Sequence, residues 1–401
     1  GTQKCPFKGG CPKLSAYIVK TKRVYFIVYS LSNIIIMRTN YIIMIFSLLF
    51  FSCKEKTIVN NREKVEYKYE LIGRKNICFK LDSITSHIFT ASEYNDKTRS
   101  YAFIHRNRLL VYDYETQKLT NDILIKAANP TSFSFINKDT IIVSDYNANS
   151  FLFMNSRGSV YKSIKVNPKI LYYPFPANKI APLKYENDTI IFWGNMSGEY
   201  INENKNNRNV MGIVDISNGQ VQYNVPYSNV YDARNWGGGL YRWVYACYNS
   251  KENKYIVSFP ADHNIYKVYT TGITGEFYAG SNFIDEIEFL DTPKWIPINS
   301  EEKTKHFVEN HSYANIIYDK WREVYYRIAE IKTKYENKMG WQKEISVIIL
   351  NKNLKIIGET KIKECNHNYR YAIFVNEKGL HIPQNTDEDV LCFKIYNLCI
   401  K

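Results

Sequence analysis

The chain has 401 residues, 45% of them hydrophobic and 23% charged, with a formal net charge of +14 and eight cysteines. A chain of this length can bury a core without disulfides or metal ions. Its charges are interspersed, which excludes a basic block of the kind that binds nucleic acid. Cys5 and Cys11 have no second ligand pair at zinc-finger spacing, so a metal site is not expected there.

An apolar run from Tyr41 to Phe51 ends at Ser52 and Cys53. The first methionine, Met37, precedes this run and is followed by Arg38. A basic residue, about ten apolar residues and a small residue before the cut are typical of a secretory signal peptide. The run is also shorter than the roughly 20 apolar residues that cross a membrane. The sequence therefore predicts export.

The pattern Leu-Phe-Phe-Ser-Cys at 49–53 resembles a bacterial lipobox. In a lipobox the cysteine receives diacylglycerol on its sulfur and becomes the new N-terminus. We expect a non-native upstream segment at 1–36, a lipoprotein signal peptide at 37–52 and lipidation of Cys53. The membrane would then be a partner through Cys53, at the outer membrane of the bacterial cell envelope, on its periplasmic or surface face. The alternative is a buried strand that ends in a core cysteine.

Removal of the leader changes the charge and the number of cysteines. Seven basic residues and no acidic residue precede Cys53, so 46 basic and 39 acidic residues remain. An exported lipoprotein with such mixed charges is not expected to bind nucleic acid. The remaining cysteines stand at 53, 78, 247, 365, 392 and 399. If Cys53 is lipidated the others are odd in number, and we expect mostly buried thiols and no essential disulfide.

Short runs rich in Val, Ile, Tyr, Phe and Thr fill the chain beyond Glu66, with polar turns between them. Such runs at intervals of about 8–12 residues indicate an all-β protein. One stretch, "IDEIEFL" at 284–290, has a spacing that fits one or two helical turns. The runs fall into groups of four at 86–126, 131–166, 179–227, 243–280 and 313–362, and a last group of three follows from Tyr371.

Six groups of strands predict a six-bladed β-propeller over residues 66–401, preceded by a tether at 53–65. The last group lacks a strand, and "EYKYELIG" at 66–73 is the expected donor. Pairing of this N-terminal strand with the C-terminal group would close the ring. The alternative is a pair of β-sandwiches, which the absence of a linker between the halves disfavours.

Two segments resemble a known family: "YIVSFPADHNIYKVY" at 255–269 and "HSYANIIYDKWREVYYR" at 311–327. They look like the TolB-like six-bladed propeller lipoproteins of the Bacteroidota, and are most similar to domain-of-unknown-function family 4221. The resemblance implies a propeller fold and an envelope location. It brings no catalytic residues.

Polar and aromatic residues gather at one face of the predicted propeller. In a four-stranded blade the turn between the second and third strands and the connection to the next blade emerge on the same face. The candidate ligand-binding residues there are His105, Asp145, Trp193, Trp236, Arg242, His263, His311, Arg327, Arg370 and His381. Guanidinium groups and aromatic rings suit an anionic or sugar-like ligand. The alternative is that polar residues collect at strand ends without a function.

No established catalytic motif is present. The sequence lacks His-Glu-x-x-His, Gly-x-Ser-x-Gly and Cys-x-x-Cys-His, so we assign no catalytic residue, metal or cofactor. The leading hypothesis is a non-catalytic lipoprotein that binds an envelope protein or a glycan; its oligomeric state stays open. The alternative is an envelope hydrolase or lyase for an anionic glycan or peptide, with a histidine as acid or base. A deep pocket with a converging histidine and carboxylate would favour the enzyme.

Overall fold

The computed structural model describes residues 57–401 except 63–64, 167–173, 177–178, 197–208, 233, 294–297, 337–341, 364 and 367–368. The chain divides into two compact units, 1–55 and 56–401. The predicted upstream segment, signal peptide and Cys53 lie outside the described residues. Within the described ranges, no helix has the length and hydropathy that crossing a membrane requires.

Four separate sheets each contain four antiparallel strands in chain order. The first sheet is formed by β3 (Ala91–Asn95), β4 (Ser100–His105), β5 (Arg108–Asp113) and β6 (Leu119–Leu124). The second is formed by β7 (Pro130–Phe135), β8 (Thr140–Asp145), β9 (Ser150–Asn155) and β10 (Val160–Lys165). The third is formed by β12 (Lys184–Glu186), β13 (Thr189–Trp193), β15 (Asn209–Asp215) and β16 (Val221–Pro226). The fourth is formed by β17 (Tyr245–Asn249), β18 (Lys254–Ser258), β19 (Asn264–Tyr269) and β20 (Gly272–Tyr278).

The remaining strands form one eight-stranded sheet and two small ones. The large sheet runs in the order β22 (Ser312–Asp319), β23 (Val324–Ile331), β24 (Glu344–Leu350), β25 (Ile356–Ile362), β2 (Tyr69–Lys80), β28 (Val390–Ile400), β27 (Gly379–Pro383) and β26 (Phe374–Asn376). The small sheets pair β1 (Thr57–Val59) with β21 (Glu286–Glu288), and β11 (Pro174–Phe175) with β14 (Asn195–Met196). The helical segments are η2 (Asn229–Tyr231), η3 (Gly239–Arg242), α2 (Ser300–Val308) and α3 (Tyr369–Ala372).

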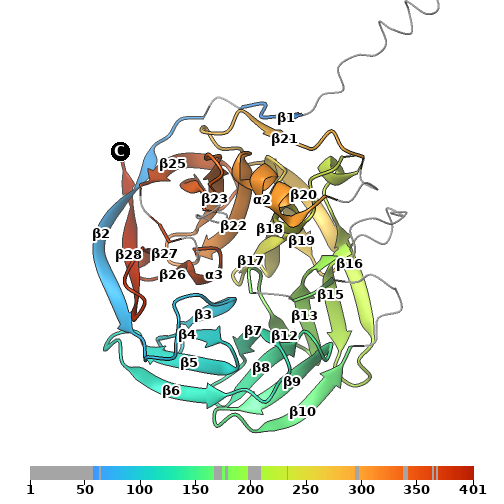
Figure 1. Ribbon diagram of the computed structural model, residues 1–401, viewed down its shortest axis with the longest axis vertical. Helices are drawn as coiled ribbons and strands as arrows, with labels where there is room; N and C mark the ends of the chain where they lie inside the picture. Colours follow the sequence, from blue (N-terminus) through green and yellow to red (C-terminus); the bar gives the residue numbers. More distant parts are fainter. Residues whose placement is uncertain are drawn as a thin grey trace, which may run out of the picture. The chain divides into compact units, whose positions relative to one another are not determined.

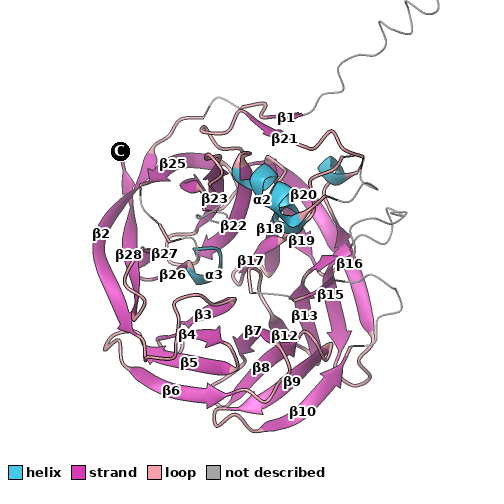
Figure 2. Cartoon of the chain, viewed as in Figure 1, coloured by secondary structure: helices cyan, strands magenta, loops and turns pink. Residues whose placement is uncertain are grey.

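The sheets of this second unit have a propeller-like arrangement (Figure 1). The first strands of successive sheets lie toward the middle, where β3 contacts β7 and β26, and β22 contacts β17 and β26. The outer strands β2, β6, β10 and β16 lie at the periphery (Figure 1). Strands dominate the unit and helical turns are confined to short connections (Figure 2). The prediction of an all-β fold with strands in groups of four is therefore confirmed.

Aromatic side chains fill the space between neighbouring sheets. Tyr101 of β4 stacks on Phe374 of β26, with ring centroids 4.9 Å apart, and its ring also lies 5.2 Å from that of Phe393 in β28. All three side chains are buried. Large rings that meet across two sheets bury much apolar surface and prefer such offset or edge contacts. The first four-stranded sheet is thereby packed against the C-terminal strands.

The N-terminal strand β2 pairs with the C-terminal strand β28, as the sequence predicts. The antiparallel register runs from Tyr69 opposite Ile400 to Lys80 opposite Val390. The register with β25 contains one parallel pair, Tyr69 and Gly358, and Leu71 N donates to Thr360 Oγ1 at 2.8 Å. A Cβ at Gly358 would lie 2.1 Å from the Tyr69 carbonyl oxygen, so this approach requires glycine.

A disulfide joins Cys78 of β2 to Cys392 of β28 across a sequence separation of 314 residues. The two cysteines are opposite each other in the register of these strands. The expectation of thiols without a disulfide is wrong for this pair, because strands remote in sequence bring the two together. Cys247 and Cys365 are buried thiols, as expected, and Cys399 is a partly exposed one.

Two local expectations between the leader and α2 are also corrected. Residues 57–62 are not a free tether, because β1 pairs with β21 along its whole length. The stretch at 284–290 forms strand β21 over Glu286–Glu288 instead of helical turns. Pairing with β1 supplies hydrogen bonds that an isolated helical turn of this length would lack. The helix of this connector is α2, whose first turn is capped by Asn299, which accepts from Glu302 N at 2.8 Å.

Candidate functional site

Nine of the ten predicted ligand-binding residues are buried, and Arg242 is partly exposed. The buried ones are His105, Asp145, Trp193, Trp236, His263, His311, Arg327, Arg370 and His381. Their side chains therefore support turns and strand ends and do not line an open rim. Burial of this kind fits the alternative interpretation, in which polar residues collect at strand ends.

Three of the histidines make hydrogen bonds inside the fold. His263 places Nδ1 2.8 Å from Tyr313 Oη and Nε2 3.0 Å from Ile58 O. His311 Nδ1 accepts from Lys332 N at 3.2 Å, and His381 Nε2 lies 2.6 Å from Tyr114 Oη. Burial lowers the pKa of His263 and His311 to about 4 and that of His381 to about 3. These imidazoles are neutral at pH 7.

Other predicted residues hold turns or fill the core. The Asp145 carboxylate accepts from the backbone N–H groups of Ala128 and Asn129, at 2.8 and 3.0 Å. Trp236 Nε1 donates to Val230 O at 3.1 Å. Trp193 packs on Tyr255 with ring centroids 5.4 Å apart. Burial also lowers the pKa of His105, whose Nδ1 has no hydrogen-bond partner among the described residues.

Arg327 fixes the turn between β18 and β19. Its guanidinium donates to the carbonyls of Asp262 and His263 at 2.6 and 2.8 Å, to Ala279 O at 3.0 Å, and through Nε to Ser258 Oγ at 3.0 Å. The group also lies over the Tyr313 ring, 3.7 Å from its centroid. Burial lowers the pKa of Arg327 to about 10. Neutral acceptors thus satisfy this cation, and neither Glu323 nor Glu330 pairs with it.

A buried ionic cluster lies where β22, β23, β24 and α3 meet, and we call it the Glu330 cluster: Glu330, Lys343, Arg370, Ser312 and Tyr369. Arg370 Nη2 lies 2.5 Å and Lys343 Nζ 3.9 Å from the Glu330 carboxylate. The Ser312 and Tyr369 hydroxyls donate to the same carboxylate. Lys343 Nζ also donates to Ser312 Oγ at 2.8 Å and lies 3.6 Å from the centroid of the Phe307 ring.

Charge in the Glu330 cluster is unbalanced when both cations are protonated. Burial lowers the pKa of Lys343 to about 7, although Glu330 opposes this fall. Burial raises the pKa of Glu330, but Arg370 and Lys343 more than offset this, and the pKa lies below its usual value. Near pH 7 the cluster therefore holds a firm Glu330–Arg370 pair and a lysine close to half protonation. Of these residues only Arg370 was a sequence candidate.

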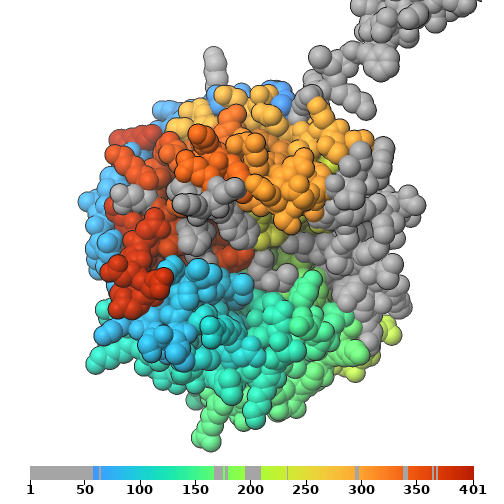
Figure 3. All heavy atoms as spheres, viewed as in Figure 1, coloured from blue at the N-terminus to red at the C-terminus, as the bar shows by residue number. Residues whose placement is uncertain are grey.

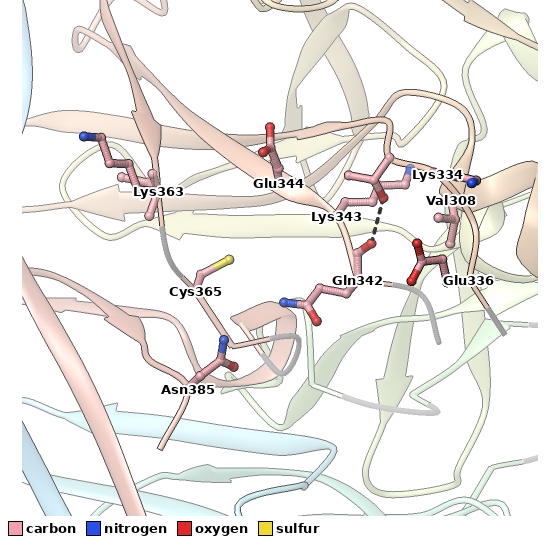
Figure 4. A pocket seen from close by; sticks show the side chains of 11 residues that line it. Val308, Lys334, Glu336, Gln342, Lys343, Glu344, Lys363, Cys365 and Asn385 are labelled. Atoms are coloured by element: carbon pink, nitrogen blue, oxygen red, sulfur yellow. Dashed lines mark hydrogen bonds between the residues drawn. The ribbon is translucent and has the colours of Figure 1, made fainter. Parts of the chain in front are cut away.

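A pocket of about 380 Å³ adjoins this cluster (Figure 4). Its lining comes from the end of α2, the connection between β23 and β24, the segment after β25 and the connection between β27 and β28. The lining residues are Val308, Thr333, Lys334, Glu336, Gln342, Lys343, Glu344, Ile362, Lys363, Cys365 and Asn385. Figure 4 shows Gln342 and Glu336 on one side, and Cys365 and Asn385 on the other. The connection between β23 and β24 thus contributes most of one wall.

Residues 48–361 match the family described as "Domain of unknown function (DUF4221)". The chain belongs to the DUF4221 family. The resemblance of the segments at 255–269 and 311–327 to domain-of-unknown-function family 4221 is therefore confirmed.

Solved structures with a similar fold include a second DUF4221 member. That protein, from Bacteroides vulgatus, has a TM-score of 0.68 at 22% identity, over 84% of this chain and 100% of its own. A putative exported protein from Bacteroides fragilis has a TM-score of 0.47 at 13% identity, over 86% and 98%. A streptogramin B lyase has a TM-score of 0.42 at 10% identity, over 84% and 100%. The likeness to the Bacteroides vulgatus protein shows a shared fold. No curated protein sequence matches this chain.

The pocket of this DUF4221 protein is lined by amides, carboxylates and lysines, and one of these lysines is Lys343, whose pKa burial lowers to about 7. Burial raises the pKa of the Cys365 thiol to about 12, so it stays protonated. None of His105, His263, His306, His311 and His381 hydrogen-bonds to a described carboxylate. In the described part of the chain, no group of three His, Cys, Asp or Glu residues is arranged to hold a metal ion.

Two half-buried aromatic rings meet above the inner strands. Trp243, just after η3, and Tyr371, in α3, have ring centroids 5.8 Å apart. Tyr371 O accepts from Ser92 Oγ of β3 at 2.5 Å. The connection before β17, which carries Trp243, and the connection before β26, which carries Tyr371, thus contact each other. The second of them is also hydrogen-bonded to β3, the first strand of another sheet. Half-buried aromatic rings of this kind can stack on a planar or sugar-like group.

Replacing Lys343 with Met is expected to leave the DUF4221 protein at least as stable as the parent at pH 7. Between the folded pKa of about 7 and the ordinary 10.5 the unfolded chain binds more protons than the folded one, so the parent gains stability as the pH rises. The destabilisation of the parent below pH 7 corresponds to about 5 kcal/mol. Urea unfolding from about pH 6 to about pH 10 should show the advantage of Lys343→Met shrinking with pH.

Lys361→Met provides the matched control for this experiment. Lys361 forms an exposed ion pair with Glu344, at 2.6 Å. Loss of an exposed pair should change the free energy of unfolding by less than about 1 kcal/mol, with little dependence on pH. A constant difference between Lys343→Met and the parent across the pH range would contradict the assignment of a buried, easily deprotonated amine.

Proposed function

We propose that this DUF4221 protein is a membrane-anchored lipoprotein of the bacterial cell envelope whose β-propeller binds a ligand or protein partner without transforming it. The observation that carries the proposal is the pocket beside the Glu330 cluster, which is lined by amides, lysines and carboxylates and by no histidine. The candidate histidines are buried, and His263, His311 and His381 make hydrogen bonds within the fold.

The proposed envelope location has two supports. The signal-like run and the lipobox-like pattern at 49–53 predict export and lipidation of Cys53. The disulfide between Cys78 and Cys392 is of a kind that forms and persists in oxidising compartments such as the periplasm. We place the protein at the outer membrane, on its periplasmic or surface face, in the TolB-like lineage of the Bacteroidota.

The proposed propeller has six blades. The eight-stranded sheet would comprise two of them, β22–β25 and β26–β28 with β2 as the outermost strand. The single registered pair between β25 and β2 supports this division, because β2 and β28 pair over ten residues. An outer strand from the N-terminus closes a ring whose other blades come from consecutive strands.

A polar ligand with hydrogen-bonding groups suits the proposed site. Gln342 and Asn385 supply amide donors and acceptors, while Lys334 and Glu336 supply charges of opposite sign. Val308 and Ile362 add apolar surface to the lining. We therefore infer a glycan or a peptide segment as the ligand class, with the ring pair of Trp243 and Tyr371 as a neighbouring stacking surface.

The test is a binding screen of the purified chain against glycan and peptide panels, followed by calorimetry of each hit. Replacing Asn385 with Trp should fill the pocket and weaken binding by at least about tenfold, or about 1.4 kcal/mol. Lys138→Trp is the matched control, since Lys138 is exposed and lines a separate cavity of about 160 Å³. Unchanged affinity in Asn385→Trp rejects this pocket. Chemical conversion of a bound hit during incubation rejects the non-catalytic assignment.

A further inference from the structure

The described residues belong to the folded unit from Thr57 onward. β1 pairs with β21 through Thr57 with Glu288, Ile58 with Ile287 and Val59 with Glu286. Figure 3 shows side chains of this N-terminal segment beside those of the 281–310 connector at one edge of the ring. This backbone pairing fixes both the position and the direction of residues 57–59 along β21.

Asn60 locks this segment in place. Its Nδ2 donates to Ser281 O at 2.9 Å and to Ile284 O at 2.7 Å, and its Oδ1 accepts from Tyr278 Oη at 2.7 Å. The side chain is 8% exposed. A buried amide with all these partners is costly to release, because each of its groups would be left unsatisfied or would have to regain water.

His263 holds the same segment from the turn between β18 and β19. Its Nε2 lies 3.0 Å from Ile58 O, while Nδ1 faces Tyr313 Oη. Arg62 adds an ion pair with Asp285. A residue predicted from sequence as a ligand contact therefore fastens the N-terminal segment to the ring.

The free length between Cys53 and this fastened segment is short. Only residues 54–56 separate Cys53 from β1, and four residue steps span at most about 14 Å when fully extended. A folded unit of this size has a radius of gyration of about 20 Å. A lipid on Cys53 could therefore bring only one edge of the ring against a bilayer.

We propose that the β1–β21 edge is the membrane-facing surface of this protein, with Val59 and Phe283 at the lipid headgroups. This rests on the proposed lipidation of Cys53. Val59 is 53% and Phe283 41% exposed, and Asn60 bonds the carbonyls on both sides of Phe283 through Ser281 and Ile284. The partner is a zwitterionic bilayer surface.

Charges at this edge argue against an anionic lipid as the source of attraction. Glu286 and Glu288 are exposed, and the Asp285 side chain is 86% exposed even though it pairs with Arg62. Anionic headgroups would be repelled by these carboxylates within a Debye length of about 10 Å. The lipid on Cys53 must then attach the protein to the bilayer. The short linker at 54–56 and the fastened segment with β1 and Asn60 must set the orientation of the ring.

The test uses the full lipidated protein in vesicles of phosphatidylcholine and phosphatidylethanolamine. The photo-crosslinker p-benzoylphenylalanine replaces Phe283 in one variant and Tyr161 in the control. Tyr161 is 60% exposed on β10, which lies across the ring from β1 and β21 (Figure 1). We expect phospholipid adducts at position 283 to exceed those at 161 by at least tenfold, without loss when the salt is raised.

Mass spectrometry of the N-terminal peptide separates the two levels of the inference. Diacylglycerol absent from Cys53 overturns both the envelope proposal and this one. If diacylglycerol is present on Cys53, two results would overturn the proposed orientation alone. One is equal yields of lipid adducts at positions 283 and 161, and the other is adducts at position 283 to protein instead of lipid. In an Asn60→Ala, His263→Gln variant that keeps its lipid, the 283 adducts should fall; unchanged adducts would show that the fastened segment does not set the orientation.

Discussion

Replacing Glu330 with Gln is expected to lower the free energy of unfolding by about 3–5 kcal/mol, because the Arg370 guanidinium would remain buried without its counter-charge. Glu330 and Arg370 are 0% and 3% exposed, so water cannot take over the lost interaction. The Ser312 and Tyr369 hydroxyls would also lose a charged acceptor. Equilibrium unfolding in urea measures the effect.

Glu344→Gln is the matched control, since residue 344 is opposite Ile331, the neighbour of Glu330, in the same sheet. Its ion pair with Lys361 is exposed, and its loss should cost less than about 1 kcal/mol. Combining Glu330→Gln with Arg370→Met should recover part of the loss, because the second change removes the stranded charge. Additive losses in the double variant would sink this account of the cluster.

Loss of the disulfide is expected to lower the free energy of unfolding by about 2–5 kcal/mol. Cross-linking two residues 314 positions apart removes a large amount of chain entropy from the unfolded state. The Cys78→Ser, Cys392→Ser double variant should keep the fold, since β2 and β28 remain paired by backbone hydrogen bonds. Urea unfolding with and without a reductant is the measurement.

Cys399→Ser controls for the removal of a thiol from β28. Cys399 is not disulfide-bonded and is partly exposed, so its replacement should be nearly neutral. A reductant should lower the stability of the parent to that of the double variant and leave the double variant unchanged. A parent insensitive to reduction would mean that the bond contributes nothing to stability.

Much of the fold follows from local pattern. The run "TIIVSDY" predicts a strand, and β8 covers Thr140–Asp145, because consecutive β-branched residues favour a strand, and five of the six residues of β8 are buried. The grouping by fours follows from the spacing of these runs. The prediction of helical turns at 284–290 is wrong because local pattern does not decide the structure there. Ile284 and Ile287 have helical spacing, but pairing with the remote strand β1 makes the segment a strand.

The candidate site was only partly predictable, because burial depends on neighbours that are distant in sequence. Arg327 and Glu330 lie in one strand, β23, and both are fully buried. One is satisfied by carbonyls of another sheet and the other by Arg370 and Lys343. Nothing within "VYYRIAEI" distinguishes these environments. The predicted strand topology indicates which face of the propeller a residue lies on. It does not indicate whether the side chain of that residue is exposed to solvent.

The pairing of β2 with β28 has a consequence for the biogenesis of the protein. β2 is synthesised about 300 residues before its partner β28, and at ordinary rates of synthesis the two are separated by roughly 15–60 s. During that interval β2 presents an unpaired edge, which is prone to aggregation. Under the proposed export, the ring would close only after both β2 and β28 had crossed the membrane, because each is the other's partner in the closing pair.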